Sequence, residues 1–415
     1  MNLPDTVDGD TRQAQREAIA FLKDPERRRG WRDFYDLAYS APPIYLGHDE
    51  WLIAGRDDVL TTMRDEGAEL TARYPTTLSP DINELFLGML PFESGSEHRR
   101  LRSLTQPLFS AATMARLQTH LAGLIDDLLY PAAFTADGCD VLNTLGVRVP
   151  EMMSCLLLDV IPDDRDRIGR WARTMYGQLG RYDQSKEEML ESEAACHDFR
   201  MYVRSRMAGE RSARCGGVGE SLIEDWRNGG LNDEQLTCYF ALFLFTGLDT
   251  LTHAIGNSLW FLGNSPEVFS TLRRSPELVE AAFAEAMRLW GPIRLCVRQL
   301  QRPVQLGGAS LPEGSTVFLV VHSANRDPRR LEHPDELSWH RRRGEDLAFG
   351  VGPHGCLGTA IGKLVGRTLF RSVVSNCESL RVTPGPDNPP FIPSQPILGI
   401  ESVRLFAVPA PNVPG

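Results

Sequence analysis

Apolar residues recur at helical spacing through most of the middle of the chain. Steps of three and four positions place them on one side of a helix, as in a helix packed against a core. Pro150 and Pro162 are expected to break the longest such region. The pattern predicts helices over residues 31–40, 57–65 (capped by Asp57), 98–109, 113–129 and 276–289, and several more over residues 141–208.

The longest apolar stretch lies at residues 232–263. Between residues 235 and 263, Asp249 is the one formally charged side chain, and about 20 apolar residues suffice to cross a membrane. Polar residues nevertheless interrupt the second half of the stretch. A helix buried in the core explains both the apolar run and its interruptions, so the sequence favours a core helix that begins near Asn232 and ends at Gly263.

Short alternating runs predict small β-sheets towards both ends of the chain. Residues 44–54 have the pattern of a hairpin with a polar turn, and residues 316–321 and 380–408 carry further β-like runs. The proline-containing segment 67–97 lacks a clear period and predicts a long irregular loop, a feature that is often functional. The polar residues 1–30 predict a partly ordered lead-in.

Composition narrows the class of protein. The chain has 415 residues, 42% of them hydrophobic, which is enough for a sizeable core. A net charge of −11 disfavours a nucleic-acid or anionic-membrane partner. Eight scattered cysteines without a Cys-x-x-Cys pair indicate reduced thiols, and the acidic N-terminus lacks a signal peptide's apolar region. We expect one cytoplasmic, mainly α domain with small β-sheets (α+β) over residues 1–415, with a surface linker at residues 215–219.

One cysteine stands in a distinctive loop, Phe-Gly-Val-Gly-Pro-His-Gly-Cys-Leu-Gly, at residues 349–358. Its glycines permit positive φ and the close approach of a bulky group. Cys356 directly precedes a predicted helix, where unpaired N–H groups and the helix dipole favour thiolate over thiol. A lone cysteine after such a turn is usually just buried, but this loop predicts a cradle for a cysteine ligand to a large, flat group.

Two further pairs of residues stand at informative helical spacings. Glu285 and Arg288 are three positions apart and share a helix face, as do many surface pairs. His98 and Arg102 are four positions apart, so both side chains could reach carboxylates on one ligand. For the neighbouring Arg99 and Arg100, a basic solvated face is fully plausible.

A third pair, Asp249 and Thr250, lies in the middle of the long helix beside Gly247. A helical glycine costs about 1 kcal/mol relative to alanine, which suggests that room is needed there. An acid followed by a threonine can relay protons from solvent. A kink with locally satisfied polar side chains is compatible with the same residues.

The motifs occur in the order and context of one family. Asn325-Arg-Asp-Pro328 lies between the Glu285-x-x-Arg288 motif and the cysteine loop, and the other motifs precede them. Across nearly its whole length the chain resembles the cytochromes P450 of the soluble bacterial type. The resemblance implies a triangular, mainly helical single-domain fold and haem b as cofactor. It also implies a cysteine thiolate ligand that promotes O–O cleavage.

The resemblance also implies a role for each motif. Cys356 ligates the iron, and Phe349 packs near its sulfur. Glu285 and Arg288 form a structural pair, while Asp249 and Thr250 are catalytic, helping to protonate iron-bound dioxygen. Four side chains contact the haem propionates: His98, Arg102, Arg298 and His354.

By the same resemblance, substrate contacts are expected along the long helix and from three other segments, residues 67–97, 293–295 and 397–398. Its residues at steps of three and four form a stripe whose aromatic half would border substrate and whose polar half would lie over the haem edge: Tyr239, Phe243, Thr246, Thr250, His253 and Asn257. A satisfied core histidine is the favoured interpretation of His253. Ile293, Arg294 and Ile397 complete the predicted pocket; Arg294 either pairs with a substrate carboxylate or points to the surface.

The implied activity is that of a haem-thiolate monooxygenase that oxidises a small organic molecule, in the tailoring of a bacterial natural product. Hydroxylation, epoxidation, demethylation and oxidative coupling all stay open. The chain has no room for a fused reductase, so a ferredoxin and its NAD(P)H-dependent reductase would supply electrons. A basic patch for an acidic ferredoxin could include Arg99, Arg100, Arg342, Arg343, Lys363 and Arg367, unless these side chains are merely solvated.

Three other activities are compatible with parts of the sequence. A peroxide-driven peroxygenase typically lacks the acid–threonine pair, so Asp249 and Thr250 argue against it. A non-catalytic haem sensor or carrier would have no use for that pair. A cysteine hydrolase using Cys356 and His354 is the weakest alternative, because these residues are only two positions apart.

Overall fold

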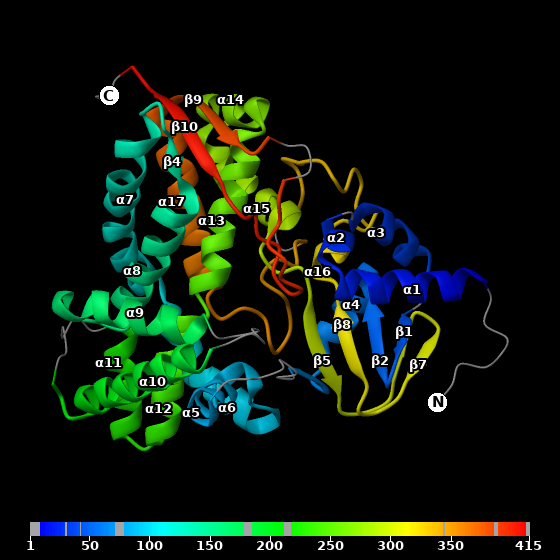
Figure 1. The fold of residues 1–415 in the computed structure, drawn as a ribbon, viewed down its shortest axis with the longest axis horizontal. Helices are drawn as coiled ribbons and strands as arrows, with labels where there is room; N and C mark the ends of the chain where they lie inside the picture. Colours follow the sequence, from blue (N-terminus) through cyan, green and yellow to red (C-terminus); the bar gives the residue numbers. More distant parts are fainter. Residues whose placement is uncertain are drawn as a thin grey trace.

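The structure, a computed structural model, describes residues 9–29, 31–41, 43–70, 79–177, 185–210, 217–342, 345–385 and 389–411. A large helical part lies beside a smaller part that contains most of the strands (Figure 1). This architecture confirms the predicted mainly helical fold with small sheets. The predicted surface linker at residues 215–219 is wrong where the structure describes it: Gly217, Val218 and Gly219 are buried, and Val218 and Gly219 form the start of a helix. Residues 215 and 216 lie outside the described residues.

Helices make up most of the described chain. The first half contains α1 (Gly9–Lys23), α2 (Pro25–Arg29), α3 (Trp31–Ser40), α4 (Arg56–Arg64), α5 (Pro80–Leu87), α6 (Gly95–Thr105), α7 (Ala111–Ala133), α8 (Val147–Leu157), α9 (Arg165–Tyr176) and α10 (Lys186–Met207). The second half contains α11 (Val218–Arg227), α12 (Asp233–Phe245), α13 (Leu248–Gly263), α14 (Pro266–Arg274), α15 (Val279–Trp290), α16 (Val321–Ala324) and α17 (Thr359–Asn376). Four short 3₁₀-helices are described: η1 (Leu90–Phe92), η2 (Gln106–Phe109), η4 (Pro162–Asp164) and η5 (Pro276–Leu278). The element η3 (Leu142–Gly146) is a π-helix.

The strands form three small sheets. Five strands pair in the order β1-β2-β8-β5-β3, three in the order β4-β10-β9, and two as β6-β7. Neighbours in these sheets are antiparallel except β2 and β8. The strands are β1 (Ile44–Gly47), β2 (Glu50–Ile53), β3 (Ala68–Leu70), β4 (Cys139–Asp140), β5 (Cys296–Leu300), β6 (Val304–Leu306), β7 (Ala309–Leu311), β8 (Thr316–Leu319), β9 (Cys377–Thr383) and β10 (Arg404–Pro409).

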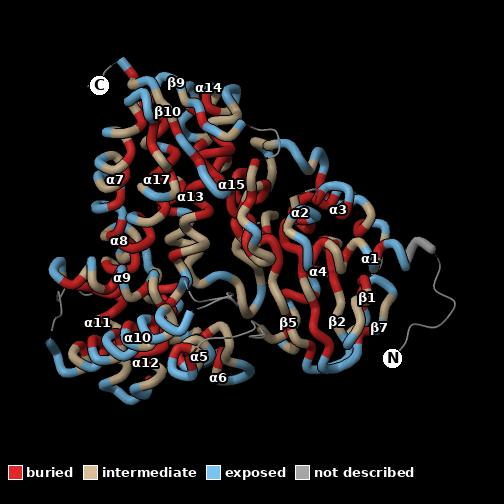
Figure 2. Tube along the Cα trace, viewed as in Figure 1, coloured by how far each residue is buried: buried red, intermediate tan, exposed pale blue. Residues whose placement is uncertain are grey.

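The long apolar stretch folds as two successive helices, α12 and α13. In Figures 1 and 2, α13 runs through the middle of the helical part, and α12 lies at its lower end near α10 and α5. Asn232 begins α12 through a capping box with Gln235, as its residue type predicted. Asp233–Gly263 is long and apolar enough to span a membrane, but most of it is buried inside the protein. A helix that is apolar on all sides belongs in a core, as predicted.

The helix is interrupted at Thr246 and Gly247. The Thr250 hydroxyl donates to the Thr246 carbonyl at 2.9 Å, and the Thr246 hydroxyl donates to the Leu242 carbonyl at 2.7 Å. Threonine hydroxyls that bond one turn back bend helices. The predicted kink is therefore present, at the point where the helix passes the cavity described below.

Segment 67–97 is not the irregular loop that the sequence predicted. It contains β3, α5, η1 and the start of α6. Ser79 caps α5 by accepting from the backbone N–H of Ile82, and Pro80 occupies the first turn, where a missing N–H does no harm. The prolines interrupted the apolar period without preventing these elements. Residues 71–78 lie outside the described residues.

Pro150 does not break the helical region, contrary to the prediction. It lies inside α8, directly after the π-helical turn η3. A proline cannot donate to the carbonyl four residues back, which here belongs to Gly146. The hydroxyl of Thr252 on α13 donates to that carbonyl instead. A contact from another helix thus compensates for the missing N–H.

Two expectations near the N-terminus are also modified. Residues 1–30 were expected to be a partly ordered lead-in, and their described portion forms α1 and α2, with Ala18 and Phe21 in the core. Helix α4 begins at Arg56, and no side chain caps it, so Asp57 lies in its first turn. An acidic residue there still interacts favourably with the helix dipole.

Glu285 and Arg288 on α15 form a fully buried ion pair. Nε and Nη2 of Arg288 donate to the two carboxylate oxygens at 2.8 and 2.9 Å. Arg288 has no solvent exposure. Its remaining N–H groups donate to the carbonyls of Asn325, Pro334 and Glu336. The pair therefore ties α15 to the segment that leads into the cysteine loop, which is a structural role.

His322 is expected to make folding sensitive to acid. It is buried, 3.1 Å from the Tyr35 hydroxyl and 3.0 Å from the Leu289 carbonyl. Burial, and then Arg326 and Arg294, lower its pKa well below the usual value. The unfolded chain therefore binds a proton near pH 6.5 that the folded chain does not, so stability is complete above pH 6.5 and declines below it.

We expect this histidine alone to remove about 1.4 kcal/mol between roughly pH 7.5 and 5.5. Comparison of urea unfolding midpoints at the two pH values in the parent and His322→Gln should show a smaller loss in the variant. His340→Gln, at an exposed histidine, is the control. Equal acid sensitivity in all three proteins would contradict the assignment.

Candidate active site

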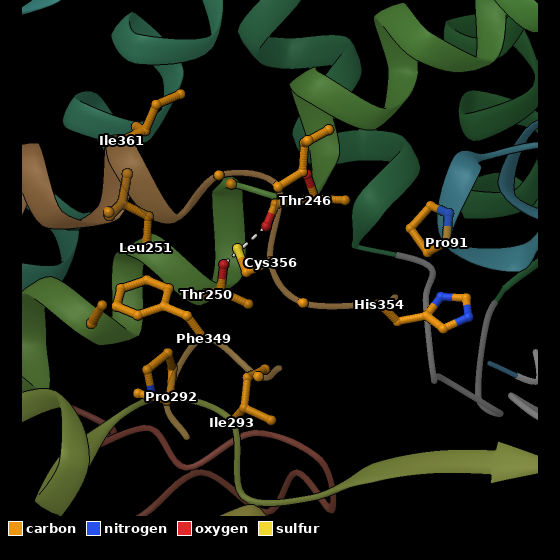
Figure 3. A pocket seen from close by; sticks show the side chains of 18 of the residues that line it. Pro91, Thr246, Thr250, Leu251, Pro292, Ile293, Phe349, His354, Cys356 and Ile361 are labelled. Carbon is orange, nitrogen blue, oxygen red and sulfur yellow. Dashed lines mark hydrogen bonds between the residues drawn. The ribbon is translucent and has the colours of Figure 1, made fainter. Parts of the chain in front are cut away.

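A cavity of about 390 Å³ lies where the cysteine loop faces the α12–α13 junction. Figure 3 shows His354 and Cys356 of the loop together with Thr246 and Thr250 of the junction around this space. Helix α6 and strand β5 close it on another side. Three motifs that are far apart in the sequence therefore meet at one site.

The cysteine loop has the backbone geometry that its glycines predicted at two of three positions. Gly350 and Gly352 have φ of 64° and 76°, whereas Gly355 has no positive φ. A Cβ on Gly352 would lie 2.3 Å from the Met63 carbonyl oxygen, so α4 also requires glycine there. The Cys356 N–H donates to the Phe349 carbonyl at 2.7 Å. The loop is thus held by its own backbone rather than through the sulfur.

The Cys356 sulfur is accessible from the cavity, but protein atoms surround it closely on its other sides. Burial raises the pKa of the thiol, while the Gly358 N–H, the Thr359 hydroxyl and Arg102 act in the opposite direction. The expected effect of the helix start is present, but burial outweighs it. A bound metal ion deprotonates a coordinating thiol outright, which would complete the ionisation.

Four side chains with basic groups gather at one edge of the cavity: His98, Arg102, Arg298 and His354. The rings of His98 and His354 lie 4.3 Å apart, at an interplanar angle of 32°. Arg102 donates to the Gly355 carbonyl at 2.7 Å, which joins α6 to the cysteine loop. The predicted pair at positions 98 and 102 therefore faces the same space as Arg298 of β5.

No described carboxylate forms an ion pair with Arg102 or Arg298. Burial and then the neighbouring basic groups lower the pKa of His354 to about 3, and burial lowers that of His98. The buried Nδ1 of His354 has no hydrogen-bond partner among the described residues. Buried cations are normally paired. This edge of the cavity is therefore built for an anionic group.

These features fit the cofactor that the sequence predicted. Sulfur is available on one side, cationic groups lie at the edge, and apolar walls such as Phe349 and Leu251 line much of the rest. Gly362 keeps the space for Phe349, because a Cβ there would lie 2.8 Å from the ring. A large, flat molecule with acidic substituents and a metal that accepts sulfur would satisfy the unpaired groups.

Several residues of the predicted pocket and stripe do line the cavity, namely Phe243, Thr246, Thr250 and Ile293. Arg294 and Ile397 do not. Arg294 is 1% exposed and donates to the Ser394 and Gln395 carbonyls. It therefore faces neither a substrate carboxylate nor the surface. A long flexible side chain can satisfy backbone carbonyls that are remote in sequence, which spacing cannot predict.

The stripe along the long helix also divides. Tyr239, His253 and Asn257 are buried but do not line the cavity. Asn257 Nδ2 donates to the carbonyls of Trp290 and Leu398 at 2.8 and 2.7 Å. The interruption at Thr246 and Gly247 turns the second half of the helix towards the C-terminal segment, so a single straight stripe was the wrong geometry.

Helix α8 contributes a wall that sequence reasoning missed. Pro150, Met153, Ser154 and Leu157 line the cavity. Their spacing marks one face of a helix, but spacing alone does not say what that face covers. Cys296, a second cysteine on the cavity, was also missed because it lies in a strand without a motif.

The basic residues proposed for a redox partner are mostly engaged. Arg99 lies 3.3 Å from Glu66, and Arg367 lies 3.2 Å from Glu280. Arg100 pairs with Glu97 at 2.7 Å, the Lys363 ammonium lies 5.7 Å from the centre of the Phe349 ring, and Arg342 is exposed. Arg343 lies outside the described residues. Ion pairs of this exposed kind are weak, so the side chains stay available to a partner.

Known proteins match the chain over most of its length. A family model described as cytochrome P450 matches residues 219–404. The biotin biosynthesis cytochrome P450 of Bacillus subtilis (strain 168) is 23% identical over 368 residues, covering 87% of this chain and 91% of that protein. The cytochrome P450 monooxygenase PikC of Streptomyces venezuelae is 24% identical over 367 residues, covering 86% and 85%.

A solved structure agrees with these relatives. The crystal structure of CalO2 superposes with a TM-score of 0.81 at 26% identity, covering 97% of this chain and 99% of that one. The sequence match and the fold match therefore extend across the cysteine loop, α12, α13 and α6 together.

Proposed function

The chain belongs to the cytochrome P450 family, and on that premise we propose that Cys356 is the haem ligand of a ferredoxin-dependent monooxygenase. Members of this family are monooxygenases that bind haem b through a cysteine thiolate. The protein is therefore a haem-binding oxidoreductase of the monooxygenase type. The assignment to Cys356 rests above all on one observation. Its sulfur faces a cavity edged by cationic groups that no described carboxylate neutralises.

The basic cluster would hold the haem's two carboxylates. Arg102 and Arg298 supply donors suited to carboxylates, and His98 and His354 add polar contacts at the same edge. Phe349, which lines the cavity and packs against Gly362, would lie near the sulfur and restrict access of water to it. The bound haem supplies the activation of dioxygen with electrons delivered one at a time.

Thr250 and Asp249 would deliver protons. The Thr250 hydroxyl lines the cavity and is bonded to the Thr246 carbonyl, so its oxygen can still accept a proton donor. Asp249, with a side chain 29% exposed, can exchange protons with water. The two residues therefore lie between solvent and the cavity, next to the interruption in the helix.

The substrate is proposed to be a small, mainly apolar organic molecule of natural-product metabolism. Leu90, Phe243 and Leu157 line the cavity together with Thr246, and Ser154 is a polar residue among them. The names of several relatives refer to biosynthetic pathways, as in the polyketide biosynthesis cytochrome P450 PksS of Bacillus subtilis (strain 168). We place the protein in the cytoplasm, with a ferredoxin and an NAD(P)H-dependent reductase as partners.

Titration of the ferric protein with candidate natural products tests this function. A ligand that enters the cavity should shift the absorption spectrum of the ferric protein from the low-spin to the high-spin form. The same compound should then be oxidised when ferredoxin, reductase and NAD(P)H are added. Oxidation with peroxide but not with any ferredoxin system would establish the peroxygenase alternative, and spin shifts without turnover would favour a sensor.

Thr250→Val is expected to uncouple the enzyme. Valine keeps the shape of the side chain but removes the hydroxyl, so product per NAD(P)H should fall about tenfold or more while NAD(P)H is still consumed. Thr237→Val is the matched control, because Thr237 makes the same bond to the carbonyl four residues back but lies away from the cavity. Equal coupling in both variants would contradict the role of Thr250.

A further inference from the structure

His253 makes a direct contact with the acid of the proton route. Its Nε2 lies 3.2 Å from Oδ1 of Asp249, one turn earlier on α13. The histidine side chain is 9% exposed, compared with 29% for the aspartate. Neither residue lines the cavity. The contact therefore lies behind the helix face that Thr250 presents to the site.

The ring of His253 is enclosed by the C-terminal segment. A Cβ on Gly399 would lie 2.3 Å from Nδ1 of His253, so glycine at that position makes room for the ring. One turn further along α13, Asn257 binds the same segment through Leu398 and Ile400. The imidazole is therefore held in one orientation, and its Nε2 edge points at Asp249.

The enclosed side of the ring identifies the tautomer. Nδ1 is buried and has no hydrogen-bond partner among the described residues. A buried N–H without an acceptor is costly, and a charged imidazolium would carry one there. The neutral ring with its hydrogen on Nε2 avoids this and donates to the Asp249 carboxylate.

Asp249 is thereby held away from Thr250. Tyr176, at the end of α9, donates to Oδ2 of Asp249 at 3.5 Å, while His253 binds Oδ1. The Thr250 hydroxyl donates to the Thr246 carbonyl instead. Tyr176 and His253 are the described titratable groups in contact with the carboxylate. In this arrangement the acid and the threonine are not directly connected.

We propose that His253 is a positioning residue, which retains ionised Asp249 on the solvent side of α13 and releases it towards Thr250 once the carboxylate has taken up a proton. A hydrogen bond to a carboxylate is roughly twice as strong as one to a neutral acid. A proton from solvent moves to an oxygen of Asp249, and the Nε2–H···O contact weakens. The acid then passes its proton to the Thr250 oxygen, while the hydroxyl hydrogen of Thr250 leaves the Thr246 carbonyl and passes into the cavity. The effect on proton delivery rests on the proposed function, whereas the contact between His253 and Asp249 does not.

Nitrogen NMR of the histidine rings tests the contact without turnover. The holoprotein in its diamagnetic ferrous carbonyl form is used, and His253→Gln identifies the signal. We expect hydrogen on Nε2, and exchange of that hydrogen with water at least about tenfold faster in Asp249→Ala, because a charge-assisted bond is lost. Hydrogen on Nδ1, or exchange that is the same in Asp249→Ala, would overturn the proposal.

A double-mutant cycle tests the consequence, using any compound that shifts the spin state. Without the Nε2 donor, ionised Asp249 can leave its position, so His253→Phe should raise peroxide released per NAD(P)H about threefold or more. His253→Gln, which can place an amide N–H near the same point, should restore coupling. In an Asp249→Ala background His253→Phe should have no further effect.

The outcomes of the two experiments separate the proposals. An additive effect of His253→Phe in the Asp249→Ala background would mean that the ring only supports the fold, and would overturn the positioning role. Absence of turnover in every variant, including the parent, would count against the proposed function. The NMR result would then still decide whether His253 holds Asp249.

Discussion

Cys356→Ser is expected to abolish monooxygenase activity and the thiolate signature of the ferrous carbonyl spectrum. A serine hydroxyl is not ionised near neutral pH and is a poor ligand for iron. The surrounding loop should persist, because it is held by backbone contacts such as that between Cys356 N–H and the Phe349 carbonyl. We expect product formation to fall by at least about 10³-fold, as when a central catalytic group is removed.

Cys296→Ser is the matched control for this experiment. Cys296 also lines the cavity, and burial raises the pKa of its thiol. Because it lies on β5 rather than in the cysteine loop, its replacement should leave the thiolate spectrum unchanged. A normal thiolate spectrum in Cys356→Ser, or loss of that spectrum in Cys296→Ser, would show that Cys356 is not the iron ligand.

Glu285→Gln is expected to destabilise the fold by roughly 3–5 kcal/mol. The substitution keeps the size of the side chain but removes the charge that balances Arg288, which has no solvent exposure. Burial disfavours ionisation of Glu285, but the two bonds from Arg288 outweigh that effect and hold its pKa below the usual value. The apparent melting temperature and urea midpoint of the holoprotein should both fall.

The pH dependence of this effect has a definite sign. A carboxylate with a lowered pKa contributes stability above the pKa of the unfolded chain, about 4.3, and loses it as the pH falls through the folded value. The difference between parent and Glu285→Gln should therefore shrink in acid. Glu280→Gln is the control on the same helix, where the Arg367 pair is partly exposed and should contribute less than about 1 kcal/mol. Equal losses in the two variants would contradict a special role for the buried pair.

Local motifs were predictable from the sequence because their geometry is local. Glycines at 350 and 352 adopt positive φ, and Asn232 caps the long helix through a residue three positions away. His98 and Arg102 share a face of α6 because they are four residues apart. In each case the residues that interact are within one turn or one loop, so spacing alone places them.

Tertiary contacts account for the expectations that failed. Pro150 was expected to end a helix, but a hydroxyl from α13 satisfies the carbonyl that it cannot bind. Arg294 was expected near the pocket or the surface, but carbonyls a hundred residues away bind it. Neither partner is marked by any periodicity around the residue concerned.

The sequence by itself predicted the resemblance to the cytochromes P450, the mainly helical class and the motifs around Cys356. These depend on residue types at fixed short separations, which survive in any correct fold. Only the tertiary structure decided that Asp249 faces His253 and Tyr176 rather than the cavity, and that α8 forms a wall of the site. Those facts depend on how α9, α13 and the segment near Gly399 pack together, and packing between distant segments leaves no regular spacing in the chain.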